Sequence, residues 1–211
     1  MGSPATMTPL QLGDDNTSQV TLNFPFEYFG QTYTSAWVSS NGFVSFGTSA
    51  NLCCNGLPLE QAPRNTIYAY WTDLVDWSTG NPFMRQTNTD ALFGWYNTKE
   101  YGTNNLISFE INLNVGGDIQ INYGAVRNSY HQVTAGLTGP TASDNIQLFY
   151  GSNVTGLANQ SGLLSYASLI PEEPTVDCSA TPNDPECVVT YSPVATVADR
   201  KSTRLNSSHV A

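Results

Sequence analysis

The chain has 211 residues and a formal net charge of −10, a length that fits a single domain of about 100–200 residues or one larger sandwich. The acidic balance excludes a general nucleic-acid binder, because binding phosphates requires a basic surface, and it disfavours docking on anionic lipid. Hydrophobic residues make up 40% of the chain, enough for a core, and no run approaches the roughly 18 apolar residues of a membrane helix.

The first predicted strand covers Val20 to Phe26, where apolar and polar residues alternate with the period of two that marks one buried face. Pro25 lacks a backbone N–H, so it indicates an edge strand or a strand end. The next two β-rich segments, 34–40 and 43–46, flank Asn41-Gly42. Asn-Gly in this position predicts a hairpin with a type I′ turn, which needs a positive φ at both residues.

Two further strands are predicted in the middle of the chain. Ile67 to Leu74 is a run of aromatic and β-branched residues, which indicates a strand covered on both faces. Ala91 to Tyr96 is a shorter run of the same kind. We therefore expect these two segments to contribute heavily to the core.

The clearest alternation lies in the segment 106–115, followed by a turn and the segment 119–123. Gly116-Gly117-Asp118 between them predicts a second hairpin. The apolar residues of the first segment are expected to face the core on one side of the strand. They are Ile107, Phe109, Ile111, Leu113 and Val115.

Strands over 133–137 and 146–150 complete a set of about nine, separated by Gly, Asn, Asp and Pro turns, which is typical of an antiparallel sandwich. One helical turn is expected near 157–164. The predicted fold class is therefore all-β, an antiparallel β-sandwich of about nine strands followed by a Pro-rich acidic C-terminal linker.

The composition changes after residue 170, where 171–187 contains five acidic residues and four prolines. This favours an extended linker. We expect a sandwich domain over 1–170 and a linker over 171–198. Residues 199–209 (DRKSTRLNSSH) resemble a translated sequencing adapter, so 199–211 is expected to be an artefact without order. On this interpretation the chain is a fragment of a larger, truncated protein.

Several β-rich motifs occur in an order that resembles a known family. FPFEYFGQTY begins at Phe24, WVSSNGFVSFG begins at Trp37, and IYAYWTDL begins at Ile67. FGWY and the two hairpin segments, LISFEINL and DIQINYG, follow. Together they resemble the nidogen-like (NIDO) extracellular domain and related sandwich modules of bacterial surface and secreted proteins. The resemblance spans about residues 22–150 and departs from the family pattern at Ala69, Tyr70 and Gly94.

The resemblance implies an extracellular module used in adhesion, matrix or cell-surface architecture. It also implies that the domain has no catalytic residues, so no enzyme activity and no obligatory cofactor are expected. The implied location is secreted or at the cell surface, and the implied partner is an extracellular protein or glycan. A carbohydrate-binding accessory domain of a secreted hydrolase remains the alternative.

Two groups of carboxylates are candidate Ca²⁺ ligands, because Ca²⁺ prefers oxygen donors. Asp73 and Asp76 follow a predicted buried strand, and Asp14 and Asp15 form a second group. A pair such as Asp73 and Asp76 also fits glycoside hydrolysis. The alternative is that these residues accept hydrogen bonds from backbone amides in turns, as Asp commonly does.

Few other side chains are candidates for catalysis or ligand binding. His131 is the single histidine before the adapter-like tail, and no GxSxG motif accompanies it, so a turn or rim position is expected rather than catalysis. Trp71 and Trp95 lie in predicted strands and are expected in the core. Trp77 lies in a polar loop and is the candidate for ligand contact. The loops 51–64 and 76–90 are expected to carry binding, because loops commonly do so.

Four cysteines allow three pairings. Cys178 and Cys187 lie close together in the linker, which favours a local disulfide. Cys53 and Cys54 are adjacent, and three states remain open: a vicinal disulfide, a free pair, or pairing with the linker. No CxxC occurs, so zinc and thioredoxin-like chemistry are not expected.

Overall fold

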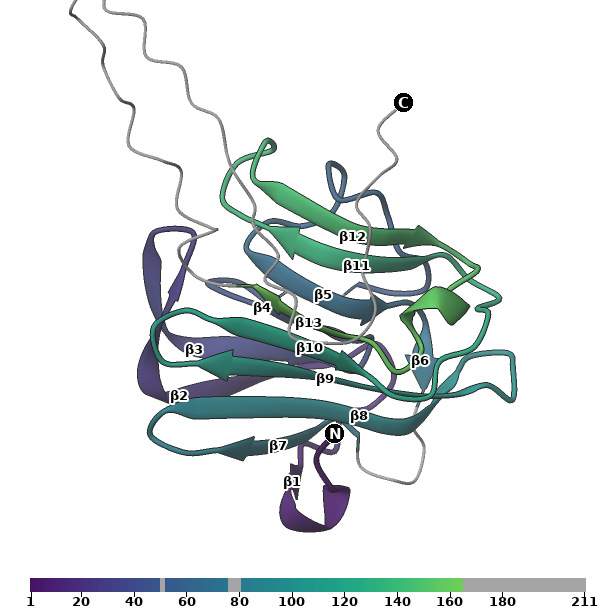
Figure 1. Cartoon of the computed structure of the whole chain (residues 1–211), viewed down its shortest axis with the longest axis horizontal. Helices are drawn as coiled ribbons and strands as arrows, with labels where there is room; N and C mark the ends of the chain where they lie inside the picture. Colours follow the sequence, from purple (N-terminus) through teal and green to yellow (C-terminus); the bar gives the residue numbers. More distant parts are fainter. Residues whose placement is uncertain (50–51, 76–80, 165–211) are drawn as a thin grey trace, which may run out of the picture.

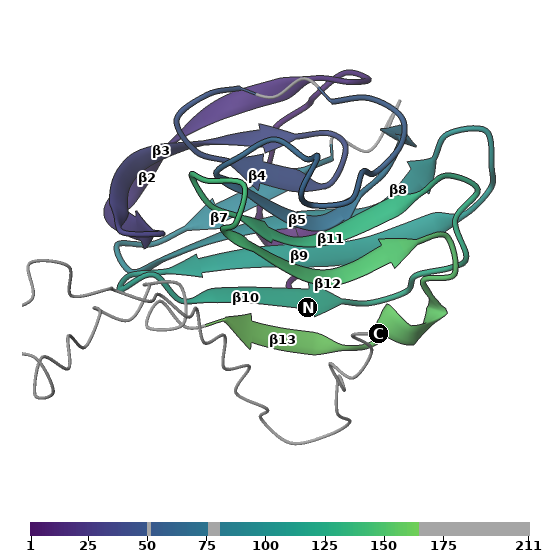
Figure 2. The same cartoon turned by 90° about the horizontal axis from the view of Figure 1, so that it is seen from above.

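The structure is a computed structural model that describes residues 1–49, 52–75 and 81–164. Two antiparallel sheets are stacked as a sandwich, and Figure 2 shows them as two layers. One sheet has the order β1-β7-β8-β9-β10-β13, with β6 beside β8. The other has the order β12-β11-β5-β4-β3-β2 (Figure 1). The predicted all-β sandwich is therefore confirmed.

The seven strands of the first sheet are β1 (Thr8–Pro9), β6 (Leu74–Val75), β7 (Phe83–Gln86), β8 (Asp90–Glu100), β9 (Leu106–Asn114), β10 (Ile119–Tyr123) and β13 (Ser161–Leu164). The six of the second are β2 (Thr17–Tyr28), β3 (Gln31–Ser39), β4 (Phe43–Ser45), β5 (Thr66–Trp71), β11 (Val133–Thr138) and β12 (Asn145–Gly151). Two short 3₁₀ turns, η1 (Pro4–Thr6) and η2 (Thr155–Leu157), complete the described elements.

The main core lies between the sheets, where the apolar sides of the alternating strands meet. Phe109 of β9 stacks on Trp95 of β8 and on Tyr70 of β5, with ring centroids 4.9 Å and 5.5 Å apart. Ile107 and Ile111 have no exposed surface. The alternation read from the sequence therefore identifies the buried side of β9, except for Val115, which is 50% exposed in the following turn.

Strand β5 is buried on both faces, and an irregularity in it decides which side chains go to which face. Between Tyr68 and Trp71 its pairing with β11 shifts register, and the backbone N–H groups of Ala69 and Tyr70 both donate to the carbonyl of Gly42. Two donors that share one acceptor indicate a β-bulge, which turns successive side chains to the same side. Tyr70 consequently joins the main core, whereas Tyr68 and Trp71 join a second cluster covered by the loop 52–65.

The edge strand β2 has an interruption where the sequence has Pro25. Its pairing with β3 skips from Thr21 to Phe26, and its exposed backbone is held by Gln86 of β7. The Gln86 amide donates to the carbonyl of Thr21 and accepts from the N–H of Asn23. The edge position predicted from Pro25 is confirmed, and the contact closes this side of the sandwich.

Three sequence expectations differ from the structure. The hairpin at Asn41-Gly42 forms, but only Gly42 has a positive φ, so the turn is not type I′. The helical turn expected near 157–164 lies earlier in the chain, at η2 (Thr155–Leu157), and Ser161–Leu164 is instead β13, which pairs with β10. Thirteen strands are described rather than about nine, since strands of two to four residues give too little periodic signal. The linker and tail expected over 171–211 lie outside the described residues.

Candidate functional site

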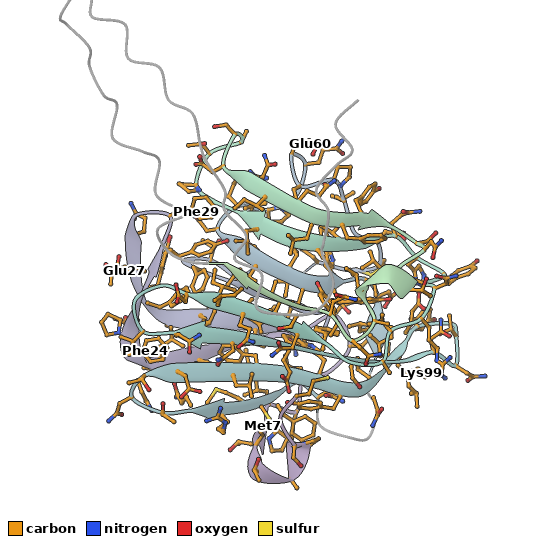
Figure 3. The ribbon with its side chains drawn as sticks, in the orientation of Figure 1. Met7, Phe24, Glu27, Phe29, Glu60 and Lys99 are labelled. Atoms are coloured by element: carbon orange, nitrogen blue, oxygen red, sulfur yellow. A yellow bond between two sulfur atoms is a disulfide. The ribbon has the colours of Figure 1, made fainter. Side chains whose placement is uncertain are left out.

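Pairing of β6 with β8 brings two buried carboxylates to the same end of the sandwich. Leu74 lies opposite Glu100 in this ladder, and the N–H of Tyr101 donates to the carbonyl of Asp73. Asp73 and Glu100 are therefore neighbours in the fold although they are distant in sequence. Figure 3 shows the exposed Lys99 of β8 at this end of the sandwich. Phe24 and Glu27 of β2 lie at the opposite end of the sandwich.

Glu100 is a buried carboxylate with a full set of donors. Its exposed surface is 0%, and Oε1 accepts from the backbone N–H groups of Tyr130 (2.7 Å) and His131 (3.1 Å) and from the Ser129 hydroxyl. The Asn105 amide donates to Oε2 at 3.0 Å. Nδ1 of His131 lies 3.3 Å from Oε1. We call Glu100 with these four residues the Glu100 hub.

These donors change the acidity of Glu100. Burial by itself raises the pKa of this carboxyl group, but the hydrogen bonds from Ser129, Asn105 and the backbone of the 130–131 segment outweigh burial and lower its pKa. A buried charge is tolerated when its lone pairs are satisfied. Glu100 is consequently an ionised anchor for the two loops that supply the donors.

The hub holds one large side chain out in solvent. Tyr130, whose N–H donates to Glu100, is 80% exposed, the highest value among the exposed large hydrophobic residues described. Its ring packs edge-on against the His131 ring at a centroid distance of 5.1 Å. Tyr101, directly after Glu100, is 52% exposed. This end of the sandwich thus exposes tyrosine rings on loops whose residues donate hydrogen bonds to the buried Glu100.

A second group of carboxylates lies at the same end, where the carboxylates are close to one another. Oxygen atoms of Asp14, Asp15 and Asp73 lie within 4.8 Å of one another, and we call these three residues the acidic corner. Asp73 is 7% exposed. Burial, and then the charge of Asp15, raise the pKa of Asp73, although His131 lowers it; burial and Asp15 also raise the pKa of Asp14.

Asn41 ties the acidic corner to its neighbours. Its side chain has no exposed surface, and Nδ2 donates to Oδ1 of Asp15 and to the carbonyl of Leu52, both at 2.8 Å. Its Oδ1 accepts from the N–H of Leu74, also at 2.8 Å. The sequence presented Asn41 as a turn residue, whereas the structure makes it a clamp between three segments.

Two cysteines border the acidic corner. Cys53 and Cys54 are paired with each other in the structure, which is one of the three states that the sequence left open. Their sulfur atoms and a carboxylate oxygen of Asp15 lie within 4.8 Å of one another. The corner therefore contains both oxygen and sulfur atoms.

The predicted candidate residues fall into two sets. The structure brings Asp14, Asp15 and Asp73 together, which the sequence had placed in separate groups. Asp76, Trp77, Cys178 and Cys187 lie outside the described residues. The loop 52–65 packs over sheet residues such as Trp71, so most of it covers the fold rather than projecting from it.

His131 lies on the rim just before β11, where the sequence placed it. Ser129 donates its hydroxyl proton to Glu100, and its oxygen accepts from the backbone N–H of His131. The Ser129 hydroxyl is therefore committed to Glu100 and not to the His131 ring. Sequence reasoning missed Glu100 and Tyr130, because neither stands in a motif and their partners come from another loop.

A model of the NIDO-related family matches residues 2–175. A search of the curated proteins found no match, and neither did a search of the solved structures. Among the described residues, no helix is long and apolar enough to cross a membrane. The family match covers both the Glu100 hub and the acidic corner.

Proposed function

Because this chain belongs to the NIDO-related family, which comprises non-catalytic modules of the extracellular type, we propose that it is a non-enzymatic adhesion or surface-architecture module. It would act as part of a larger secreted or cell-surface protein. Its partner would be an extracellular protein that it contacts with the end of the sandwich around the Glu100 hub.

One observation carries this proposal: Tyr130 is 80% exposed although its backbone is fixed on a buried carboxylate. Tyrosine supplies a large contact area at low cost in side-chain entropy, and it is enriched in protein interfaces. A loop that is already ordered loses little further entropy on binding. The Glu100 hub therefore supports a preorganised contact surface with Tyr130 at its centre.

Binding to an array of extracellular-matrix proteins tests the proposal, with Tyr130→Ala as the variant. Tyr150→Ala is the matched control, since Tyr150 is also partly exposed, at 39%, but lies on β12. We expect Tyr130→Ala to weaken binding by at least about tenfold, the loss typical of an interface anchor. Equal binding by both variants would contradict the proposed surface.

The carbohydrate-binding alternative is separated by a glycan array. Selective glycan binding that is lost in Tyr130→Ala, with no binding to the protein array, would replace adhesion by the accessory-domain role. An exposed tyrosine ring can stack on a sugar as well as on a protein side chain. The identity of the retained ligand therefore decides between the two roles.

A further inference from the structure

The Cys53–Cys54 disulfide has no evident role in stabilising the fold. In the chain-entropy account, a disulfide stabilises a protein by shortening loops in the unfolded chain, so its effect grows with the loop that it closes. The two cysteines are adjacent in the sequence, so the bond does not close a loop of any length. The sandwich is therefore expected to remain folded when this bond is reduced.

The bond is also accessible to a reductant. Cys53 is exposed and Cys54 is partly buried. Thiol–disulfide exchange requires that an attacking thiolate reach one of the two sulfur atoms. The exposed Cys53 meets this requirement without any opening of the sandwich.

Reduction would create a set of metal-binding groups. Both sulfur atoms lie within 4.8 Å of a carboxylate oxygen of Asp15, and oxygens of Asp14 and Asp73 lie within the same distance of Asp15. Two thiolates and a carboxylate are ligands that Zn²⁺ accepts in tetrahedral sites, at about 2.0–2.3 Å from the metal. Groups already this close need only small side-chain adjustments to reach one ion.

Asn41 holds these groups in place independently of the disulfide. It donates to Asp15 and to the carbonyl of Leu52, the residue directly before Cys53. A buried side chain that bonds both segments fixes the distance between them. The carboxylate and the cysteines therefore stay adjacent after the sulfur–sulfur bond is broken.

We propose that Cys53, Cys54 and Asp15 form a redox-gated Zn²⁺ site, closed in the disulfide state and open in the dithiol state. A small dithiol transfers two electrons and two protons to the Cys53–Cys54 bond, becomes a cyclic disulfide itself, and leaves two cysteine thiols. Zn²⁺ then displaces both thiol protons to solvent, because the thiolate is the form that binds metal. This site does not depend on the binding role proposed above.

The test uses the full chain with Cys178→Ser and Cys187→Ser in every sample, so that only two sulfur atoms can respond. The chain is reduced with a dithiol, which is removed by gel filtration without oxygen, and thiol titration verifies the redox state. Zn²⁺ affinity is then measured by competition with a chromogenic chelator. We expect one Zn²⁺ per reduced chain and an affinity at least about 100-fold lower in the oxidised chain.

Asp15→Asn and Glu60→Gln form a matched pair of variants, since each removes one negative charge. Glu60 is exposed in the same loop as the cysteines and projects from the molecule far from Lys99 (Figure 3). In the reduced state Asp15→Asn should weaken Zn²⁺ binding by at least about tenfold, whereas Glu60→Gln should leave it unchanged. Equal affinity in the two redox states, equal effects of the two variants, or unfolding on reduction seen by circular dichroism would each overturn the proposal.

Discussion

The Glu100 hub and the acidic corner lie at one end of the sandwich, and the pKa of the buried carboxylate is lowered in the hub but raised in the corner. Glu100 has no exposed surface and accepts hydrogen bonds from four other residues, so its pKa is lowered. Asp73 is almost as buried, but burial and then the charge of the neighbouring Asp15 raise its pKa, without a set of donors that outweighs them. Burial alone therefore does not decide the effect of a carboxylate on stability; its partners do.

Removing the hub should have the largest effect. Glu100→Ala leaves the hydroxyl of Ser129 and the N–H groups of Tyr130 and His131 without their acceptor. We expect a loss of about 3–5 kcal/mol in the free energy of unfolding, because several buried donors lose their acceptor at about 1–3 kcal/mol each. Urea denaturation measures it. Glu60→Ala, at an exposed acidic residue, is the control, and a comparable loss there would show that the hub is not special.

Asn41→Ala should have the next largest effect, because it removes the clamp of the acidic corner. The variant loses bonds to Asp15 and to the carbonyl of Leu52, and it leaves the N–H of Leu74 without its acceptor. We expect a loss of about 2–3 kcal/mol in the same assay. Asn104→Ala, at an exposed asparagine in a neighbouring loop, should be neutral; equal losses would contradict the clamp.

Because their pKa values are shifted in opposite directions, Glu100 and Asp73 should affect the pH dependence of stability in opposite ways. The pKa of Glu100 is lowered in the fold, so its stabilising contribution is present above about pH 4.5, the ordinary value, and is lost as pH falls through the folded pKa. The pKa of Asp73 is raised above its ordinary value, so its protonation on acidification stabilises the fold and partly offsets that loss.

Melting temperatures between pH 3 and pH 7 measure these slopes. Relative to the unsubstituted chain, Glu100→Gln should flatten the loss of stability on acidification, because the titrating anchor is gone. Asp73→Asn should steepen it, because the compensating gain is gone. Slopes that change in the same direction in both variants would refute the distinction between the hub and the corner.

The sequence predicts most of the fold because the alternation of apolar and polar residues along a strand can be recognised without knowing which strands pair with it. The buried side of β9 and the edge position of β2 follow from period two and from Pro25. The bulge at Ala69 and Tyr70 does not, since it depends on the Gly42 carbonyl, which another segment supplies. A Cβ at Gly42 would lie 2.3 Å from the Tyr70 carbonyl oxygen, a close approach that the turn motif alone does not reveal.

The candidate site is less predictable for the same physical reason. Asp14 and Asp15 precede β2, and Asp73 precedes β6, which belongs to the other sheet. Their proximity therefore depends on how the two sheets stack, which the sequence does not reveal. Glu100 alternates as an ordinary strand residue, and most of its donors come from the loop before β11. Local patterns report which side of a strand is buried, whereas a polar cluster depends on contacts between distant segments.

Calcium should give the smallest effect, and it would sharpen the comparison by adding positive charge to the acidic corner. The sequence offers Asp73 with Asp76, and Asp14 with Asp15, as separate candidate Ca²⁺ ligands, and the proximity of the oxygens of Asp14, Asp15 and Asp73 in the structure motivates the test. At a Ca²⁺ concentration ten times the dissociation constant, the oxidised chain should gain about 1.4 kcal/mol of stability, seen as a higher melting temperature. Asp73→Asn should abolish the gain and Glu60→Gln should retain it. A melting temperature unchanged by Ca²⁺ in the unsubstituted chain would leave the carboxylates as turn residues that repel one another.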